Sequence, residues 1–233
     1  MKLSASLFAA DPLQLGAQLA AVEPHVDSFH VDIMDGRFAA AFGLEERLVR
    51  TLLRTSVKPI DLHLMIEDPV FWAPRFAGLG ARIVAVHAES DAHVGHVLRS
   101  IRKEGALAYV ALRAETRISA VQRIIEDADG ALLVTAAAGG GNFVNAALEK
   151  AFDFPRAYPS IIDGRVEEAH FEVASTAGVD LAVIGRSLFD CKDLSARAGA
   201  RLRKSLNSRR LSHAGGIPSR IREAPLESGN LLL

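Results

Sequence analysis

Two histidines and two aspartates interrupt apolar stretches of this 233-residue sequence at spacings suited to metal chemistry. His30 and Asp32 are two positions apart, so on a β-strand both side chains face the same side. His63 lies in a second apolar run, and Asp163 ends a third. Imidazole and carboxylate groups together form a mixed nitrogen and oxygen donor set for a divalent ion such as Zn²⁺, Mn²⁺, Fe²⁺ or Co²⁺. We therefore expect these four residues to gather around a metal ion.

The elements that would position these residues alternate along the chain. Eight short apolar runs have the composition of buried strands, and they cover residues 2–6, 28–34, 59–66, 82–87, 107–112, 131–136, 159–162 and 180–184. Between them lie segments with helical periodicity, including 44–53, 69–79, 93–103, 118–127, 143–151 and 166–177. Strands that alternate with helices pair in parallel through right-handed crossovers. Eight such units predict an α/β protein with a compact (β/α)8 TIM barrel.

A doubly wound open sheet is the alternative architecture. It would not require eight evenly spaced strands, and no Gly-x-Gly-x-x-Gly sequence follows the first predicted strand. In a barrel, catalytic groups sit at the carboxyl ends of the strands, which is where the two histidines and two aspartates would meet. Inward-facing carboxylates with neither a cation nor hydrogen-bonding partners would repel each other, and their pKa values would rise. This cost favours a metal site over a purely structural role.

Composition and charge indicate a soluble, cytoplasmic protein. Hydrophobic residues make up 49% of the chain, and 27 basic residues nearly balance 28 acidic ones for a net charge of −1. This balance argues against nucleic acid as a partner, and no apolar run is long enough to cross a membrane. The first residues do not form a secretory signal, because Asp11 and Pro12 interrupt them early. The single cysteine, Cys191, cannot form an internal disulfide, which fits a reducing compartment.

The alternation of predicted strands and helices stops near residue 207. We expect one barrel domain over residues 1–207. Residues 208–233 are rich in arginine, serine, glycine and proline and show little periodicity. They predict a C-terminal extension that is irregular or packs on a neighbouring subunit.

Motifs around the candidate metal ligands carry a resemblance to a known family. They read His30-Val-Asp-Ile-Met-Asp-Gly36, Asp61-Leu-His-Leu-Met65, Val86-His87-Ala-Glu89 and Ile162-Asp163-Gly164. In this order they resemble the signatures of the ribulose-phosphate 3-epimerase family. The segments 4–11 and 177–189 are similar to that family's first and eighth units, so the resemblance spans about residues 2–207.

The resemblance implies a metal-dependent epimerase that inverts C3 of a ketose phosphate through a cis-enediolate. D-ribulose 5-phosphate and D-xylulose 5-phosphate would be its substrate pair. His30, Asp32, His63 and Asp163 would hold the metal, with Zn²⁺ expected first and Fe²⁺, Mn²⁺ or Co²⁺ as the alternatives. Asp32 and Asp163 would also be the two acid/base groups on opposite faces of the substrate. The family commonly forms dimers or hexamers, so a homo-oligomer is expected.

Further substrate contacts are carried over by position from the same family. Ser6 matches a serine near the substrate hydroxyls, and Met34 and Met65 match methionines that cap the enediolate with a polarisable surface. Val134 stands where the family has a third methionine. Phosphate would bind to backbone N–H groups offered by glycines, here Gly139, Gly140, Gly141, Gly164 and Gly185.

Four arginines depart from the family pattern at the ends of the predicted strands. Arg165 and Arg186 replace residues of the phosphate-binding loops, and we expect their side chains to contact the phosphate. For Arg37 and Arg113, contact with another anionic or hydroxyl group and simple exposure to solvent are equally open. These changes also leave open a related ketose phosphate of four or six carbons as the natural substrate.

Two other functions remain as alternatives. A decarboxylase of a sugar-acid phosphate would use an Asp-x-Lys-x-x-Asp pattern, and residues 30–35 contain no lysine. A non-catalytic or differently specific barrel that binds sugar phosphates is favoured by the altered loops, but it gives no reason to keep two histidines and two aspartates together. His87 and Glu89 are expected to support neighbouring residues, not to react themselves.

Overall fold

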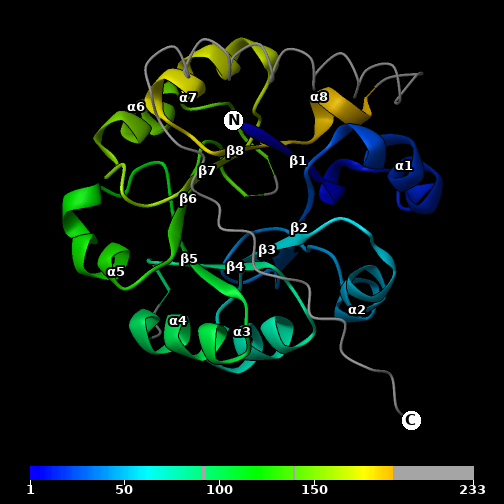
Figure 1. The fold of residues 1–233 in the computed structure, drawn as a ribbon, viewed down its shortest axis with the longest axis horizontal. Helices are drawn as coiled ribbons and strands as arrows, with labels where there is room; N and C mark the ends of the chain where they lie inside the picture. Colours follow the sequence, from blue (N-terminus) through cyan, green and yellow to red (C-terminus); the bar gives the residue numbers. More distant parts are fainter. Residues whose placement is uncertain (91–92, 139, 191–233) are drawn as a thin grey trace.

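Eight parallel strands close into a barrel in the computed structural model, which describes residues 1–90, 93–138 and 140–190 (Figure 1). Each strand pairs with its neighbours in chain order, and β8 returns to pair with β1. The strands are β1 Lys2–Ser6, β2 Ser28–Met34, β3 Ile60–Met65, β4 Ile83–His87, β5 Leu107–Leu112, β6 Gly130–Val134, β7 Ser160–Asp163 and β8 Leu181–Ile184. The predicted (β/α)8 TIM barrel is confirmed.

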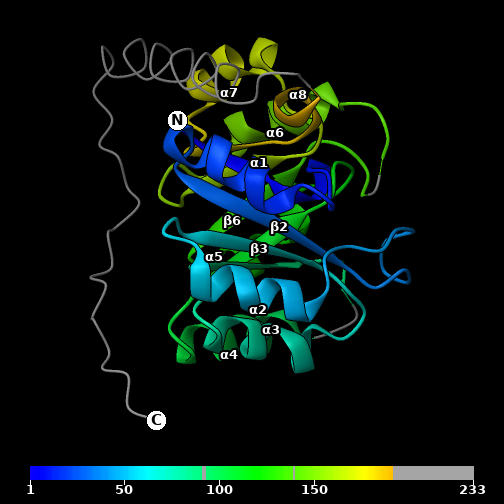
Figure 2. The same cartoon turned by 90° about the vertical axis from the view of Figure 1, so that its right-hand side faces the viewer.

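Helices follow the strands and form the outer layer (Figure 2). The α-helices are α1 Leu15–Val22, α2 Glu46–Thr55, α3 Pro69–Gly78, α4 Val94–Lys103, α5 Gln122–Glu126, α6 Asn145–Asp153, α7 Phe171–Ala177 and α8 Arg186–Phe189. Helix α4 shows why they pack on the barrel, because it buries Val94, Val97, Leu98 and Ile101 on one face. Short 3₁₀ turns form at residues 7–9, 23–25, 118–120 and 168–170.

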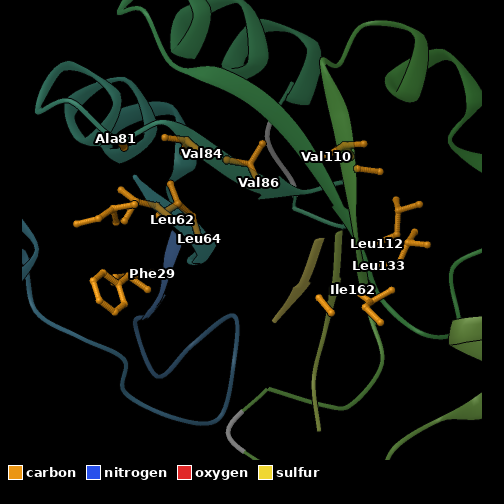
Figure 3. Packing of buried hydrophobic residues seen from close by; sticks show 14 of the residues in the cluster. Phe29, Leu62, Leu64, Ala81, Val84, Val86, Val110, Leu112, Leu133 and Ile162 are labelled. Atoms are coloured by element: carbon orange, nitrogen blue, oxygen red, sulfur yellow. The ribbon is translucent and has the colours of Figure 1, made fainter. Parts of the chain in front are cut away.

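The main hydrophobic core lies between the barrel and the helices. Strands of a parallel barrel are covered on both faces, and all seven residues of β2 are accordingly buried. Outward-facing side chains such as Leu62, Val84 and Val110 pack in this layer, where Figure 3 shows them. Each Å² of apolar surface that is removed from water in this layer stabilises the closed barrel by roughly 25 cal/mol.

The inside of the barrel is divided between an apolar half and a polar half. Strands β4 to β8 fill the interior with a separate apolar cluster that includes Ile83, Tyr109, Leu132, Ile161 and Val183. Strands β1 to β3 instead send buried polar side chains inward. These are Ser4, Ser6, Ser28, His30, Asp32, Asp61 and His63. The polar half is where ionisable groups can approach one another.

Most predicted elements begin and end within two residues of the observed ones. Three of the differences concern how an element begins, divides or ends. The helix expected over 118–127 divides into a 3₁₀ turn and the short α5, because Val121 between them has the non-helical backbone angles φ −125° and ψ 14°. The helix expected over 166–177 likewise begins with a 3₁₀ turn before α7. Strand β6 ends at Val134, where the Thr135 amide makes the last ladder hydrogen bond to the Asp163 backbone oxygen and the Thr135 hydroxyl binds the backbone oxygen of Gly164.

The expected boundary between residues 207 and 208 and the C-terminal extension lie outside the described residues. The part of the chain that is described up to Asp190 forms the barrel alone. None of the helices in the described ranges combines the length and the apolar character that crossing a bilayer requires.

Candidate active site

The register of the strands brings the four candidate ligands together. In the pairing of β2 with β3, Asp32 lies opposite His63, and alternation along β2 puts His30 on the same inner side as Asp32. Asp163 is the last residue of β7, on the other side of β1 and β8 from β2. Closure of the barrel therefore joins residues from three strands at one point near its carboxyl end.

The four side chains meet at short and similar distances. Nε2 of His30 lies 3.4 Å from Oδ1 of Asp32 and 3.4 Å from Oδ2 of Asp163. Nδ1 of His63 lies 3.3 Å from each of the same two oxygens. Ligand atoms of all four residues fall within 4.8 Å of one another. The four residues could therefore hold a metal ion.

The residues present fit a divalent ion. Two donors bonded at about 2.0–2.2 Å to one ion with a tetrahedral angle between them lie roughly 3.3–3.6 Å apart, and the four nitrogen–oxygen pairs here have this spacing. The ring nitrogens of His30 and Nδ1 of His63 are also fully buried and have no hydrogen-bond partner. Buried polar atoms without partners are costly, so a cation bound by Nε2 of His30 and Nδ1 of His63, the two nitrogens that face the carboxylates, would offset this cost.

The electrostatics of the cluster lead to the same conclusion. Burial lowers the pKa of His30, but the carboxylates of Asp163 and Asp32 outweigh it and hold that pKa well above its ordinary value. Burial raises the pKa of Asp32, and the two imidazoles outweigh this effect and keep it below its usual range. The negative charge that retains a proton on the rings would equally attract a metal cation.

A second layer of hydrogen bonds stands behind His63. Its Nε2 lies 2.9 Å from Nε2 of His87, and Nδ1 of His87 lies 2.8 Å from Oε2 of Glu89. Burial is the largest cause that lowers the pKa of His87, to about 4. Burial raises the pKa of Glu89, but hydrogen bonds from His87, Thr116 and the Arg113 amide bring it down to about 2. At neutral pH His87 is thus neutral and Glu89 is ionised.

Beneath His30 lies a polar group that sequence reasoning did not assign. Asp61 accepts hydrogen bonds from the hydroxyls of Ser4 at 2.7 Å and Ser28 at 3.1 Å, and its Oδ2 is 3.9 Å from Nδ1 of His30. Asp61 is two residues before His63 on β3, so both face the same side, but its serine partners come from two other strands. Only the placement of β1 and β2 beside β3 reveals this group.

A pocket opens above the four ligands at the carboxyl ends of the strands. Most of the predicted site residues line it, namely Ser6, Asp32, Met34, His63, Met65, Gly140, Asp163, Gly164, Arg165, Gly185 and Arg186. Apolar residues that were not predicted as contacts also line it, among them Phe8, Ala137 and Val183. Phe8 and Ala137 follow β1 and β6, Val183 lies within β8, and the barrel geometry alone brings them to the pocket. His30 lies beneath the pocket, fully buried.

The loop after β7 has an unusual backbone at the pocket wall. Gly164 has φ +116°, and a Cβ atom there would lie 2.5 Å from the amide nitrogen of Ala136, so only glycine fits. Arg165 follows with φ 56°, a left-handed conformation that non-glycine residues adopt only at a cost. The chain thus presents an exposed arginine to the pocket in a strained conformation.

Other predicted residues are placed elsewhere. Arg37 points to solvent and pairs with Glu67 at 2.9 Å. The guanidinium of Arg113 lies 4.5 Å above the ring of Phe38, and its amide binds Glu89. Neither arginine is among the residues that line the pocket, and Gly141 is also absent from the described lining. Gly139 lies outside the described residues.

The fold and this site define a class of protein, a (β/α)8-barrel enzyme with a buried histidine–aspartate cluster that could bind a metal ion. A model of the "Ribulose-phosphate 3 epimerase family" matches residues 2–189. The chain therefore belongs to the ribulose-phosphate 3-epimerase family, whose members are isomerases acting on carbohydrates.

Individual relatives agree with this assignment. The chain is 31% identical over 202 residues to the ribulose-phosphate 3-epimerase of Helicobacter pylori strain J99, covering 83% of this chain and 93% of the relative. It is 33% identical over 208 residues to the ribulose-phosphate 3-epimerase of Aquifex aeolicus, covering 84% and 94%. A chloroplastic ribulose-5-phosphate-3-epimerase of Arabidopsis thaliana is 34% identical over 203 residues, covering 82% and 72%.

Solved structures with lower identity share the fold. A 3-hexulose-6-phosphate synthase from Salmonella typhimurium superposes with a TM-score of 0.72 at 18% identity, covering 89% of this chain and all 100% of that one. KGPDC from Streptococcus mutans gives a TM-score of 0.70 at 14% identity, covering 88% and 97%. At these identities the likeness shows the barrel and nothing finer.

Proposed function

We propose that this protein is a metal-dependent epimerase that inverts C3 of a ketose phosphate, with D-ribulose 5-phosphate and D-xylulose 5-phosphate as the first pair to test. A tetrulose or hexulose phosphate is the alternative substrate, since the loops around the pocket differ from the family pattern. His30, Asp32, His63 and Asp163 would hold the divalent ion, with Zn²⁺ as the first candidate because imidazole and carboxylate donors suit it.

The arrangement of the two carboxylates carries this proposal. Each turns one oxygen toward the histidine nitrogens and has its second oxygen left over. For Asp32 this second oxygen is Oδ2, which accepts a 3.1 Å hydrogen bond from the Ser6 hydroxyl. For Asp163 it is Oδ1, because Oδ2 faces the histidines. Both residues line the pocket, one from β2 and the other from β7. Two carboxylates on different sides of one pocket are what inversion of a carbon centre requires.

The chemistry follows from this placement. One aspartate removes the proton from C3, next to the C2 carbonyl, and the other delivers a proton to the opposite face. A divalent cation, when bound, would supply positive charge that stabilises the enediolate formed between these two steps. Met34, Met65 and Val134 present a surface without exchangeable protons to the same pocket, so they would limit protonation by water.

The phosphate would bind at the side of the pocket formed after β7 and β8. Arg165 and Arg186 line that side and are exposed, and the ion pairs between described residues involve other arginines. Guanidinium groups suit phosphate because they donate paired hydrogen bonds. Gly164 and Gly185 allow the backbone to approach closely there. The anion contacts proposed for Arg37 and Arg113 would need these side chains to leave their present partners.

The test is proton NMR of D-ribulose 5-phosphate in D₂O with purified protein of known metal content. We expect the C3 proton to exchange for deuterium as xylulose 5-phosphate accumulates. Protein that contains metal and catalyses no exchange would refute the pentulose assignment, and tetrulose and hexulose phosphates would then be tested in the same way. Protein that binds no metal and is inactive with all three would support a non-catalytic barrel.

Single substitutions of the aspartates separate the two proton transfers. With Asp32→Asn or Asp163→Asn, loss of one acid/base group is expected to slow epimerisation by about 10²–10⁴-fold. Exchange of deuterium into one epimer alone should persist wherever the remaining aspartate is the base for that epimer. The metal content of each variant is measured in parallel, because both residues are also proposed ligands. Equal loss of exchange from both epimers in a fully metal-loaded variant would contradict the division of roles.

A further inference from the structure

The hydrogen bonds behind His63 form a chain whose direction is determined at its far end. Glu89 lies at that end, where Oε1 accepts a 2.9 Å hydrogen bond from the Arg113 amide and another from the Thr116 hydroxyl. Its other oxygen, Oε2, faces Nδ1 of His87 at 2.8 Å. The Arg113 amide is a backbone group that can only donate, so the side chain of residue 89 must present an acceptor to it.

An ionised carboxylate can only accept hydrogen bonds, and this determines which atom donates in each following hydrogen bond. Nδ1 of His87 must carry the proton that it shares with Glu89. A neutral imidazole then has an unprotonated Nε2, which accepts from His63 across the 2.9 Å contact. When a cation replaces the second ring proton, His63 therefore keeps its remaining proton on Nε2, and its Nδ1 offers a lone pair on the side where Asp32 and Asp163 lie.

We propose that Glu89 and His87 are positioning residues that set the tautomer of His63, so that its Nδ1 is free to bind a cation. This inference rests on the proposed function only in taking the four-residue cluster as a metal site. The site's surroundings support it, because His63 and His87 are 1% and 4% exposed and water cannot readily replace the hydrogen bond between them. The ring of Phe38, centred 4.8 Å from that of His87, covers the contact.

A nearly isosteric substitution of Glu89 is expected to reverse the direction of donation along these hydrogen bonds. In Glu89→Gln the amide oxygen must turn toward the Arg113 amide, so the NH₂ group faces Nδ1 of His87 and donates to it. His87 then carries its proton on Nε2 and donates to His63, whose remaining proton moves to Nδ1, on the cation side. The size and shape of the side chain change little, so a merely structural role for Glu89 would not produce this outcome.

The experiment measures Zn²⁺ affinity by competition with a chromophoric chelator, with Zn²⁺ alone and no substrate. We expect Glu89→Gln to bind Zn²⁺ about 10–100-fold more weakly than the unaltered protein, the loss typical when a supporting partner of a histidine ligand is removed. Glu67→Gln is the matched control, because Glu67 is also a glutamate near this end of the barrel but pairs only with the exposed Arg37 there. Its affinity should be unchanged.

A second measurement reads the tautomers directly. Long-range ¹H–¹⁵N NMR of the Zn²⁺-loaded unaltered protein should show the ring proton of His63 on Nε2 and that of His87 on Nδ1. This part needs no variant, so it applies even if Glu89→Gln fails to fold. A proton on Nε2 of His87 would overturn the inference, and so would Zn²⁺ affinity in folded Glu89→Gln within twofold of the unaltered protein.

The outcomes also separate this inference from the proposed function. If the unaltered protein does not bind Zn²⁺ or another divalent ion, the proposed metal site itself fails. If it binds Zn²⁺ and Glu89→Gln binds equally well, the metal site stands and only the role of Glu89 and His87 fails.

Discussion

Single residues of opposite charge are arranged in two separate parts of the pocket. Asp32 and Asp163 bring negative charge to the buried floor, and Arg165 and Arg186 bring positive charge to the exposed wall. A phosphorylated sugar has the matching distribution, with an anionic group at one end and carbonyl and hydroxyl oxygens for a cation at the other. The separation keeps the arginines from neutralising the carboxylates, which stay available for the proposed proton transfer and metal binding.

Arg165 offers a test in which stability and binding change in different directions. Replacing it with glycine relieves a left-handed backbone strain of roughly 1–2 kcal/mol, which the greater freedom of glycine in the unfolded chain offsets by about 0.5–1 kcal/mol. We expect Arg165→Gly to keep or slightly raise the melting temperature. Loss of a charged hydrogen bond to phosphate should raise KM by about 10-fold or more.

Arg165→Ala is the control for this prediction, because it removes the same guanidinium but keeps the strained backbone. Steady-state kinetics and thermal unfolding of both variants give the comparison. Both variants should show the higher KM, and only the glycine variant, which is free of the backbone strain, should keep or slightly raise the melting temperature. A KM unchanged in both variants would remove Arg165 from the phosphate site.

Glu89 predicts a specific loss of stability in acid. Its pKa is lowered from 4.5 to about 2 in the folded protein, so the unfolded chain binds the proton more readily. The stabilisation is therefore complete above about pH 4.5 and is lost as the pH falls toward 2. We expect Glu89→Gln, which has no such carboxylate, to lose less stability than the unaltered protein over this interval. Urea unfolding at several pH values measures the difference, and parallel curves would contradict the prediction.

At the scale of elements, a loop and a helix hold the partners of Glu89 in place. The loop after β5 supplies the Arg113 amide and the Thr116 hydroxyl. From α6, the Lys150 ammonium donates to the backbone oxygens of Arg113, Ala114 and Thr116 at 2.8, 2.9 and 2.6 Å. A single cation thus fixes the path of the loop, which in turn fixes the acceptor that Glu89 must present.

Replacing Lys150 with methionine tests this role of α6. The side chain keeps much of its length, but three backbone oxygens lose their donor, and we expect the free energy of unfolding to fall by about 1–3 kcal/mol. Lys103→Met, at the exposed end of α4, is the matched control and should change stability by less than about 0.5 kcal/mol. Urea unfolding of the two variants gives the comparison. Similar values for both would show that the loop does not depend on Lys150.

At the scale of the whole molecule, the candidate metal site links parts of the barrel that are distant in sequence. His30 and Asp32 come from β2, His63 from β3 and Asp163 from β7. A cation bound to all four would therefore resist opening of the barrel between β7 and β2. Bound metal would stabilise the native state because the unfolded chain does not present the four ligands together.

Removal of metal should consequently lower the melting temperature. At a free Zn²⁺ concentration of 100 times Kd, binding stabilises the fold by about 2.7 kcal/mol. For a chain of this size that corresponds to a decrease of about 5–10 °C when a chelator is added. Differential scanning calorimetry with and without chelator measures it, and Asp163→Asn should show a much smaller difference. No change in the unaltered protein would argue against a bound metal of this affinity.

The predicted assembly of this chain into dimers or hexamers stays a prediction. Light scattering coupled to size-exclusion chromatography measures the mass in solution directly, and a mass of about one chain would refute it. The predicted extension over 208–233 belongs to the same experiment, because packing on a neighbouring subunit requires that such a neighbour exist.

Much of this protein could be predicted from local sequence patterns. The alternation of apolar runs with helical segments predicts the barrel, because a parallel sheet covered by helices needs that order of elements. The two-residue spacing of His30 and Asp32 puts them on one strand face, since side chains alternate along a strand. The end of an apolar run marks Asp163 as a residue at the carboxyl end of a strand. These inferences depend only on neighbours in the sequence.

The barrel predicted from the sequence already implies that the two histidines and two aspartates meet, but only the tertiary structure decided which of their atoms pair and which further residues join them. Closure of the barrel and the register between strands bring Asp163 to His30 and place His87 against His63, and no local period encodes those pairings. The same applies to Arg37, which lies at a strand end as predicted but pairs with Glu67 in the next loop. Local spacing determines the face on which a side chain lies, whereas its partner depends on how all eight strands fit together.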